Sequence, residues 1–161
     1  MEKETRPVLA WIGEVITLVA VTAWVGGHAA LGAFAARIAF RDLDRGVAST
    51  LMTTVFRSFD TLALWALIAL GLATVLRAAA LGREAWRGLA FVSLATAAAL
   101  LAVGVLGIGW VHPRIEEMFR LGTTLDPRFA ALHRLSERLG HLEVLLTMLL
   151  FGSLAWRRRH G

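Results

Sequence analysis

Two long stretches without a charged residue constrain this chain more than any other feature. Residues 15–36 and 88–113 contain no Asp, Glu, Lys or Arg, and each exceeds the roughly 20 residues that a helix needs to cross a bilayer. The chain is 57% hydrophobic with a mean hydropathy of +0.65, above the roughly 45–50% apolar share of soluble domains. One soluble core built from 161 residues could not bury this much apolar surface. The sequence therefore predicts an integral membrane protein.

Two further apolar stretches complete a set of four predicted spans. Asp60 and Arg77 enclose an uncharged stretch that becomes a span if Arg77 extends its head group along the helix to the membrane surface. The last stretch, residues 139–156, is interrupted only by Glu143. We place the spans at about 9–36, 55–80, 88–111 and 139–156, in one all-α transmembrane domain that forms a four-helix bundle. The alternation of a membrane β-barrel is absent.

The connections between the spans also carry signals. Polar residues 41–54 favour a short surface helix. Pro113 is expected to end the third span because a proline lacks the backbone N–H and clashes with the preceding turn. Residues 115–121 then read as a short amphipathic segment on the membrane surface. Asp126-Pro127 is a strong helix start, and it predicts one continuous helix to about Trp156 that projects beyond the hydrocarbon.

The charges exclude some classes of partner and favour others. The net charge is +5, but the arginines flank the apolar stretches, which fits phospholipid head groups rather than nucleic acid. The second loop and the tail are short and densely basic, which favours both termini in the cytoplasm. The chain has no cysteine, so disulfides, thiolate metal sites and a cysteine nucleophile are excluded.

Ionisable residues inside a span are costly and therefore mark candidate functional sites. The predicted topology gathers six such residues in the membrane half far from the termini: His28, Asp60, His112, His133, His141 and Glu143. Glu14 lies about 21 Å from His28 along one helix and belongs to the other half. There it is either protonated or faces a partner subunit.

The plainest interpretation of these residues is structural. Arg57 and Asp60, at i and i+3, are expected to form a local ion pair at the interface, and His133 and Glu137, at i and i+4, a contact of the same sort. His28 is expected to bond Glu143 or a backbone carbonyl. Asp60, Arg57, Arg114 and Glu14 are thus candidate structural polar residues.

A sharper interpretation is cofactor binding, because imidazoles on different helices of a bundle can ligate haem iron, a chlorophyll-type pigment or copper. The candidate ligands of a tetrapyrrole are His28, His133 and His141. Those of a copper or zinc ion are His28, His112, His141 and Glu143. The chain has no His-x-x-x-His or Glu-x-x-His pattern of a di-metal bundle. The spacing leaves the structural and the cofactor interpretation open.

Three short motifs point to a known family. Trp24-Val25-Gly26-Gly27 lies in the first span, His112-Pro113-Arg114-Ile115 ends the third, and residues 128–136 (RFAALHRLS) open the fourth. In this order they resemble the bacterial membrane family of unknown function that is related to eukaryotic transmembrane protein 205, and more loosely the copper-resistance D type. The resemblance implies a four-helix membrane protein without an agreed activity. His28 and Gly140 stand where that family usually has an apolar residue and an asparagine.

Three functions are compatible with the sequence. No phosphate loop, nucleotide fingerprint or catalytic constellation is present, which favours a non-enzymatic accessory or structural subunit that binds the lipid bilayer and other membrane subunits. The histidines favour, as an alternative, a protein that binds a tetrapyrrole or a metal. The resemblance alone suggests a third function, related to efflux or resistance.

Overall fold

A computed structural model describes residues 2–160, with the side chains of residues 7–83 and 85–156. Within this part of the chain every regular element is helical. In chain order they are α1 (Glu2–Val21), η1 (Thr22–Gly26), α2 (Gly27–Ala30), η2 (Leu31–Ala35), α3 (Ala36–Asp42), α4 (Arg45–Leu81), η3 (Gly82–Trp86), α5 (Gly88–Leu106), η4 (Gly107–Val111), α6 (His112–Arg120) and α7 (Pro127–His160). The segments η1, η2 and η4 are single π-helical turns, and η3 is a 3₁₀ turn.

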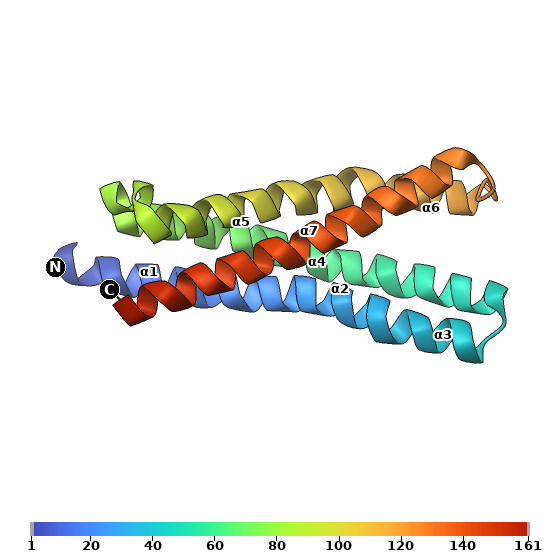
Figure 1. Cartoon of the computed structure of the whole chain (residues 1–161), viewed down its shortest axis with the longest axis horizontal. Coiled ribbons are helices and arrows are strands. Elements are labelled where there is room, and N and C mark those ends of the chain that lie inside the picture. Colours follow the sequence, from blue (N-terminus) through green and yellow to red (C-terminus); the bar gives the residue numbers. More distant parts are fainter. Residues whose placement is uncertain (1, 161) are drawn as a thin grey trace.

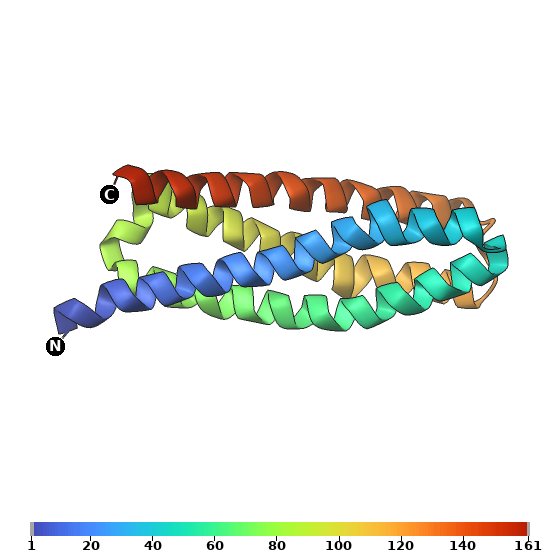
Figure 2. The same cartoon turned by 90° about the horizontal axis from the view of Figure 1, so that it is seen from below.

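Contiguous elements merge into four long antiparallel rods (Figure 1). Each contains a helix long and apolar enough to cross a membrane: Pro7–Asp42, Arg45–Leu81, Gly88–Arg120 and Pro127–Trp156. Both termini and the α4–α5 connection lie at one end of the bundle, called the near side. The α3–α4 and α6–α7 connections lie at the other, the far side (Figure 2). The predicted all-α bundle of four membrane helices is confirmed.

The helices run further than the predicted spans, and two of the expected connections are different. Residues 41–54 form no separate surface helix, because α3 continues to Asp42 and α4 begins at Arg45. The prediction that Pro113 ends the third span is also wrong. The helix passes through α5, η4 and α6 without a break. The π-helical turn at Gly107–Val111 widens the backbone spiral just where the proline ring would otherwise meet the preceding turn.

The start of the fourth rod is as the sequence predicts. The Asp126 carboxylate accepts a hydrogen bond from the backbone N–H of Arg128 at 2.8 Å, which satisfies one of the free N–H groups in the first turn of α7. The helix then continues past Gly140 to His160. Its 34 residues span roughly 51 Å at 1.5 Å per residue, more than a hydrocarbon core of about 30 Å.

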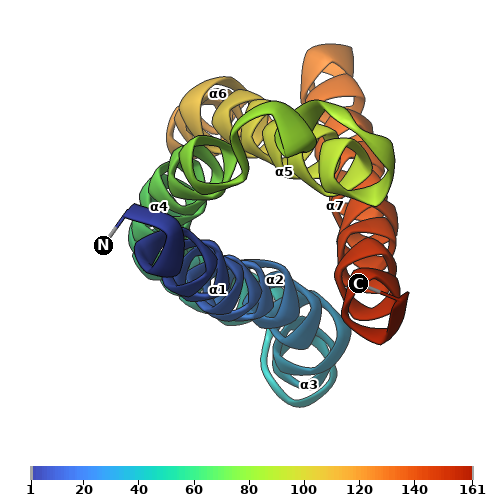
Figure 3. The ribbon, with the colours of Figure 1, turned by 90° about the vertical axis from the view of Figure 1, so that its left-hand side faces the viewer.

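The rods pack as two antiparallel pairs. α1 lies along α4 and α5 lies along α7, while α4 and α5 join the pairs; seen end-on, the four rods form an arc (Figure 3). The core is centred on large apolar side chains without solvent exposure: Val21, Trp24, Leu70, Leu100 and Leu150. Gly104 lets the Trp24 indole cross to α5, since a Cβ there would lie 2.7 Å from the ring.

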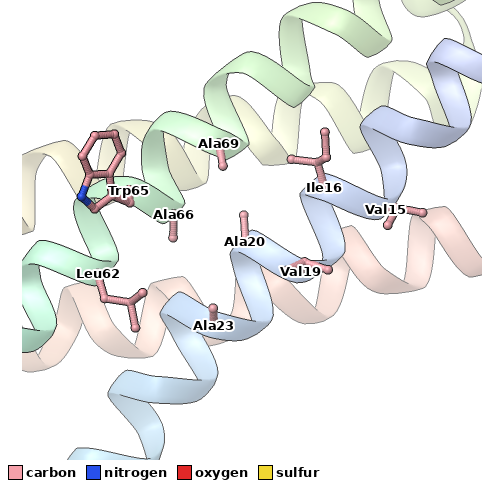
Figure 4. A pocket seen from close by; sticks show the side chains of 9 residues that line it. All are labelled: Val15, Ile16, Val19, Ala20, Ala23, Leu62, Trp65, Ala66 and Ala69. Carbon is pink, nitrogen blue, oxygen red and sulfur yellow. The ribbon is translucent and has the colours of Figure 1, made fainter.

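The outer surface of the bundle is apolar, as lipid contact requires. A shallow groove of about 340 Å³ runs between α1 and α4, lined only by apolar side chains (Figure 4). Four of them are the alanines Ala20, Ala23, Ala66 and Ala69, and the exposed Trp65 lies at one end.

Arg77 does not extend to the membrane surface, so the sequence-based prediction for it is wrong. Its side chain is fully buried and donates a hydrogen bond to the Ser93 hydroxyl of α5 at 2.8 Å. The stem packs on α1, where Gly13 leaves the space, since a Cβ there would lie 2.5 Å from the Arg77 Cγ. Glu14, the next residue, is also buried. The near half of the bundle thus holds a buried polar layer, and the inward position avoids exposing a guanidinium to lipid.

Candidate functional site: a histidine–carboxylate chain across four helices

His28 and Glu143 connect the first rod to the fourth. The His28 Nδ1 and a Glu143 carboxylate oxygen are 3.6 Å apart, and their side chains are 19% and 8% exposed. Glu143 is therefore a carboxyl group on a membrane-spanning helix, turned into the bundle and placed against an imidazole. Such a group is costly in lipid unless it is paired, and His28 is the partner that the structure provides.

His112 and Asp60 connect the third rod to the second in the same way. The His112 Nδ1 lies 3.1 and 3.3 Å from the two Asp60 carboxylate oxygens, within hydrogen-bonding distance. The two side chains are about one-quarter exposed. Since a carboxylate can only accept, the Nδ1 carries the proton in this hydrogen bond.

The two pairs meet at the histidines. The ring centroids of His28 and His112 are 6.0 Å apart, with the rings nearly perpendicular, and the Phe59 ring lies 4.8 Å from His28. Gly27 makes the phenyl contact possible, since a Cβ there would lie 2.3 Å from the Phe59 ring. Asp60, His112, His28 and Glu143 thus form a chain to which each of the four rods contributes one residue. We call these four residues the polar chain.

Two π-helical turns lie directly beside the polar chain. The segment η1 ends two residues before His28, which lies in α2, and η4 ends immediately before His112. A π-helical turn inserts one residue into an α-helix and so rotates everything that follows. Such turns recur at functional sites. Here they set the direction in which both histidines point, relative to the apolar faces of the same helices.

Two predicted ligands do not join the polar chain. His133 is exposed; its Nε2 lies 3.6 Å from Glu137, as the i,i+4 spacing predicts, and its ring stacks on Phe129. His141 is also exposed. Among the side chains that the structure describes, no group of three or more His, Asp or Glu has the geometry to hold a metal ion.

The expected Arg57–Asp60 pair is replaced by two contacts between helices. Arg57 forms an ion pair with Glu116 of α6, and Asp60 pairs with His112 instead. The third span had been expected to end at Pro113, and its continuation as α6 is what brings Glu116 alongside α4. Arg114 packs over the Trp110 ring at 4.1 Å, a cation–π contact typical of a membrane interface. Glu14 lies far from these groups, in the near half.

Fold and site together define a multi-pass membrane protein built as a four-helix bundle with ionisable groups between its helices. The chain belongs to a family whose model, described as "Domain of unknown function (DUF4149)", matches residues 19–123. The match includes three members of the polar chain, His28, Asp60 and His112, and stops before α7. No curated protein matches the chain. No solved structure matches it either.

Proposed function

We propose that this chain is a non-enzymatic accessory subunit of a larger assembly in the bacterial inner membrane, with its termini in the cytoplasm. We include in the proposal a relationship of its family to eukaryotic transmembrane protein 205. Two of the motifs that carry this resemblance, residues 24–27 and 112–115, lie within the matched region. The observation that supports the accessory role is an apolar surface on the α3–α4 hairpin.

The hairpin is longer than a bilayer requires. The first two membrane helices have 36 and 37 residues, or roughly 54 Å each at 1.5 Å per residue. A bilayer with its head groups is about 40–45 Å thick. With the α4–α5 connection at the near surface, the first turns of α4 and the end of α3 extend past the far head groups.

Apolar side chains cover this projecting part. Ile38, Phe40, Leu43, Val47 and Leu51 are each more than one-third exposed. The hairpin keeps its own small core of Ala39, Ala48 and Met52, so these side chains are not needed to hold it together. Exposed apolar surface beyond the reach of lipid is typical of a docking site for another protein. A membrane subunit with a far-side domain fits this surface.

The test is the size of the complex extracted from native membranes in a mild detergent. We expect the wild-type chain to elute with at least one other subunit in a fixed ratio. Ile38→Glu and Val47→Glu should each release it as the free chain, because burying a carboxylate at either position in an interface costs desolvation free energy. Thr50→Glu, with the same charge at an exposed polar position of the same hairpin, should leave the complex intact.

Two results would contradict the accessory role. One is a wild-type chain that elutes alone or only with copies of itself. The other is a complex that survives both substitutions while far-ultraviolet circular dichroism shows the same helix content for all variants.

The polar chain supports a second candidate function, binding of a tetrapyrrole or a single metal ion by His28 and His112. In both histidines the Nδ1 faces a carboxylate, the arrangement that fixes the ring orientation of metal-ligating histidines. The structure gives no such support to His133 and His141, which are exposed. When bound, the iron of a haem or a copper ion would supply redox chemistry, and the two imidazoles would hold it.

Absorption spectroscopy and elemental analysis of the protein purified from its native membrane test this function. We expect a tetrapyrrole band or a stoichiometric metal, lost in both His28→Ala and His112→Ala. The matched control is His133→Ala, which removes an imidazole outside the polar chain and should retain the ligand. A colourless, metal-free wild type contradicts the candidate function, and so does a ligand that survives both substitutions.

A further inference from the structure

Two buried polar atoms continue the polar chain toward the membrane centre. Trp24 lies one turn before His28 on the first rod, and Thr147 lies one turn after Glu143 on α7. The Trp24 Nε1 and the Thr147 Oγ1 are both buried and have no hydrogen-bond partner within the described part of the protein. Each is roughly 6 Å deeper along its helix than its polar-chain neighbour, at 1.5 Å per residue.

The Thr147 hydroxyl differs from three other threonine hydroxyls in the spans. The hydroxyls of Thr17, Thr74 and Thr96 each donate to the backbone carbonyl four residues earlier, at 2.7–2.8 Å, which is how a threonine is satisfied in an apolar helix. The Thr147 hydroxyl has no such bond. The Trp24 indole is fully buried, and an indole N–H can only donate. A buried donor without an acceptor is costly enough that it indicates a water or another ligand.

Exposure falls from the Asp60–His112 pair to Glu143. The side chains of Asp60 and His112 are 24% and 26% exposed, that of His28 is 19% exposed and that of Glu143 is 8% exposed. Trp24 is fully buried, and η1, which carries it, contacts α7. The polar groups therefore form a series that starts at the more exposed Asp60–His112 pair and ends where η1 contacts α7.

An apolar layer closes the path at its inner end. Val21, Leu70, Leu100 and Leu150 are fully buried in one core cluster. On its other side begins the separate polar layer around Arg77 and Ser93. The polar groups of the far half are therefore not continuous with those of the near half.

We infer that the polar chain lines a water-filled inlet, open to the far side, that ends at Trp24 and Thr147. Water or a small polar solute that accepts a hydrogen bond occupies its inner end and takes the indole N–H. Water is the smallest such ligand, and two to four polar partners suffice to hold it. The inlet is independent of the accessory role and of any bound cofactor.

The natural absence of cysteine makes thiol accessibility a direct test. A membrane-impermeant methanethiosulfonate reagent reacts with thiolates, which form in water and not in lipid or a dry core. Thr147→Cys is nearly isosteric and places a thiol at the end of the inlet. Leu145→Cys, on the exposed lipid-facing side of α7, and Leu150→Cys, in the apolar layer, are the matched controls.

The expected result is one-sided labelling in sealed membrane vesicles of both orientations. Thr147→Cys should react at least roughly tenfold faster than both controls, because only its thiol ionises readily, and only when the reagent is on the far side. Equal rates at positions 147 and 150 would overturn the inlet. So would labelling of position 147 from the near side, since the apolar layer is then no barrier. Circular dichroism of each variant establishes that the rates refer to the folded bundle.

Discussion

Replacing Arg77 with alanine is expected to lower the free energy of unfolding by about 3–5 kcal/mol, from the loss of a buried, charged hydrogen bond and of the packing around a long side chain. The Arg77 side chain is fully buried between three rods. Its guanidinium bonds Ser93, and its stem packs on Gly13. Truncation removes the donor to Ser93 and leaves space that α1 and α5 cannot fill without moving. It also removes a cation from a layer that holds the buried Glu14.

One further variant separates charge from packing at this position, and another is a surface control. Arg77→Met keeps most of the stem and should recover part of the loss, because its thioether chain fills the space on Gly13. Arg83→Ala removes an arginine of the exposed near-side loop and should change the stability by less than about 0.5 kcal/mol. Unfolding in mixed micelles of rising SDS fraction, followed by tryptophan fluorescence, measures all three. If Arg77→Ala and Arg83→Ala unfold together, the buried layer does not stabilise the bundle.

The number and direction of the membrane helices could be predicted from the sequence because lipid admits few alternatives. A backbone in hydrocarbon must satisfy its own hydrogen bonds, so each apolar stretch long enough to cross becomes a helix. The cap at Asp126 was equally local, since a carboxylate followed by proline has one preferred place in a helix. The continuation of the third helix through Pro113 could not be predicted in this way, because a π-helical turn such as Gly107–Val111 leaves no clear signal in composition or periodicity.

From the sequence, the candidate site could be predicted only as far as the half of the membrane in which it lies. Antiparallel topology alone brings His28, Asp60, His112 and Glu143 to similar depth. Which of them touch depends on rotation about each helix axis, and the π-helical turns shift that rotation in two of the four rods. Phe59, whose ring packs against His28, was missed because a phenylalanine in an apolar span carries no signal of its own.

His141 illustrates a constraint that the sequence did contain. At 100° per residue, positions two apart on a helix point in nearly opposite directions. Once Glu143 faces the bundle, His141 must face outward, and the structure shows it exposed. Because His141 faces outward, it cannot bind the same ligand as the inward-facing histidines and Glu143.

Arg77 posed a different difficulty. An arginine near the end of a span can avoid lipid either by extending to the membrane surface or by turning into the bundle. Only its packing partner, Gly13, decides between the two.

Gly104→Leu is expected to destabilise the bundle by about 3 kcal/mol or more, since overpacking a well-filled core costs about 1–3 kcal/mol and more where the neighbours are rigid. A Cβ at this position would lie 2.6 Å from Leu67 and 2.7 Å from the Trp24 indole. Both neighbours are buried, and the indole ring cannot bend away as a flexible chain could. Gly104→Ala, with the Cβ alone, should show a smaller loss of the same sign.

The matched control is Gly109→Leu, one and a half turns further along the same rod, where nothing within the described structure lies within 4 Å of the added Cβ. It should leave the SDS unfolding midpoint nearly unchanged. Adding Leu67→Ala to Gly104→Leu returns volume to the contact and should restore part of the stability, as size exchange does in packed cores. The comparison of Gly104→Leu with Gly109→Leu also bears on the inlet. A displaced indole would move the Trp24 N–H, which lies at the inner end of the inlet. If Gly104→Leu and Gly109→Leu unfold alike, Trp24 does not cross to α5, and the inner end of the inlet lies elsewhere.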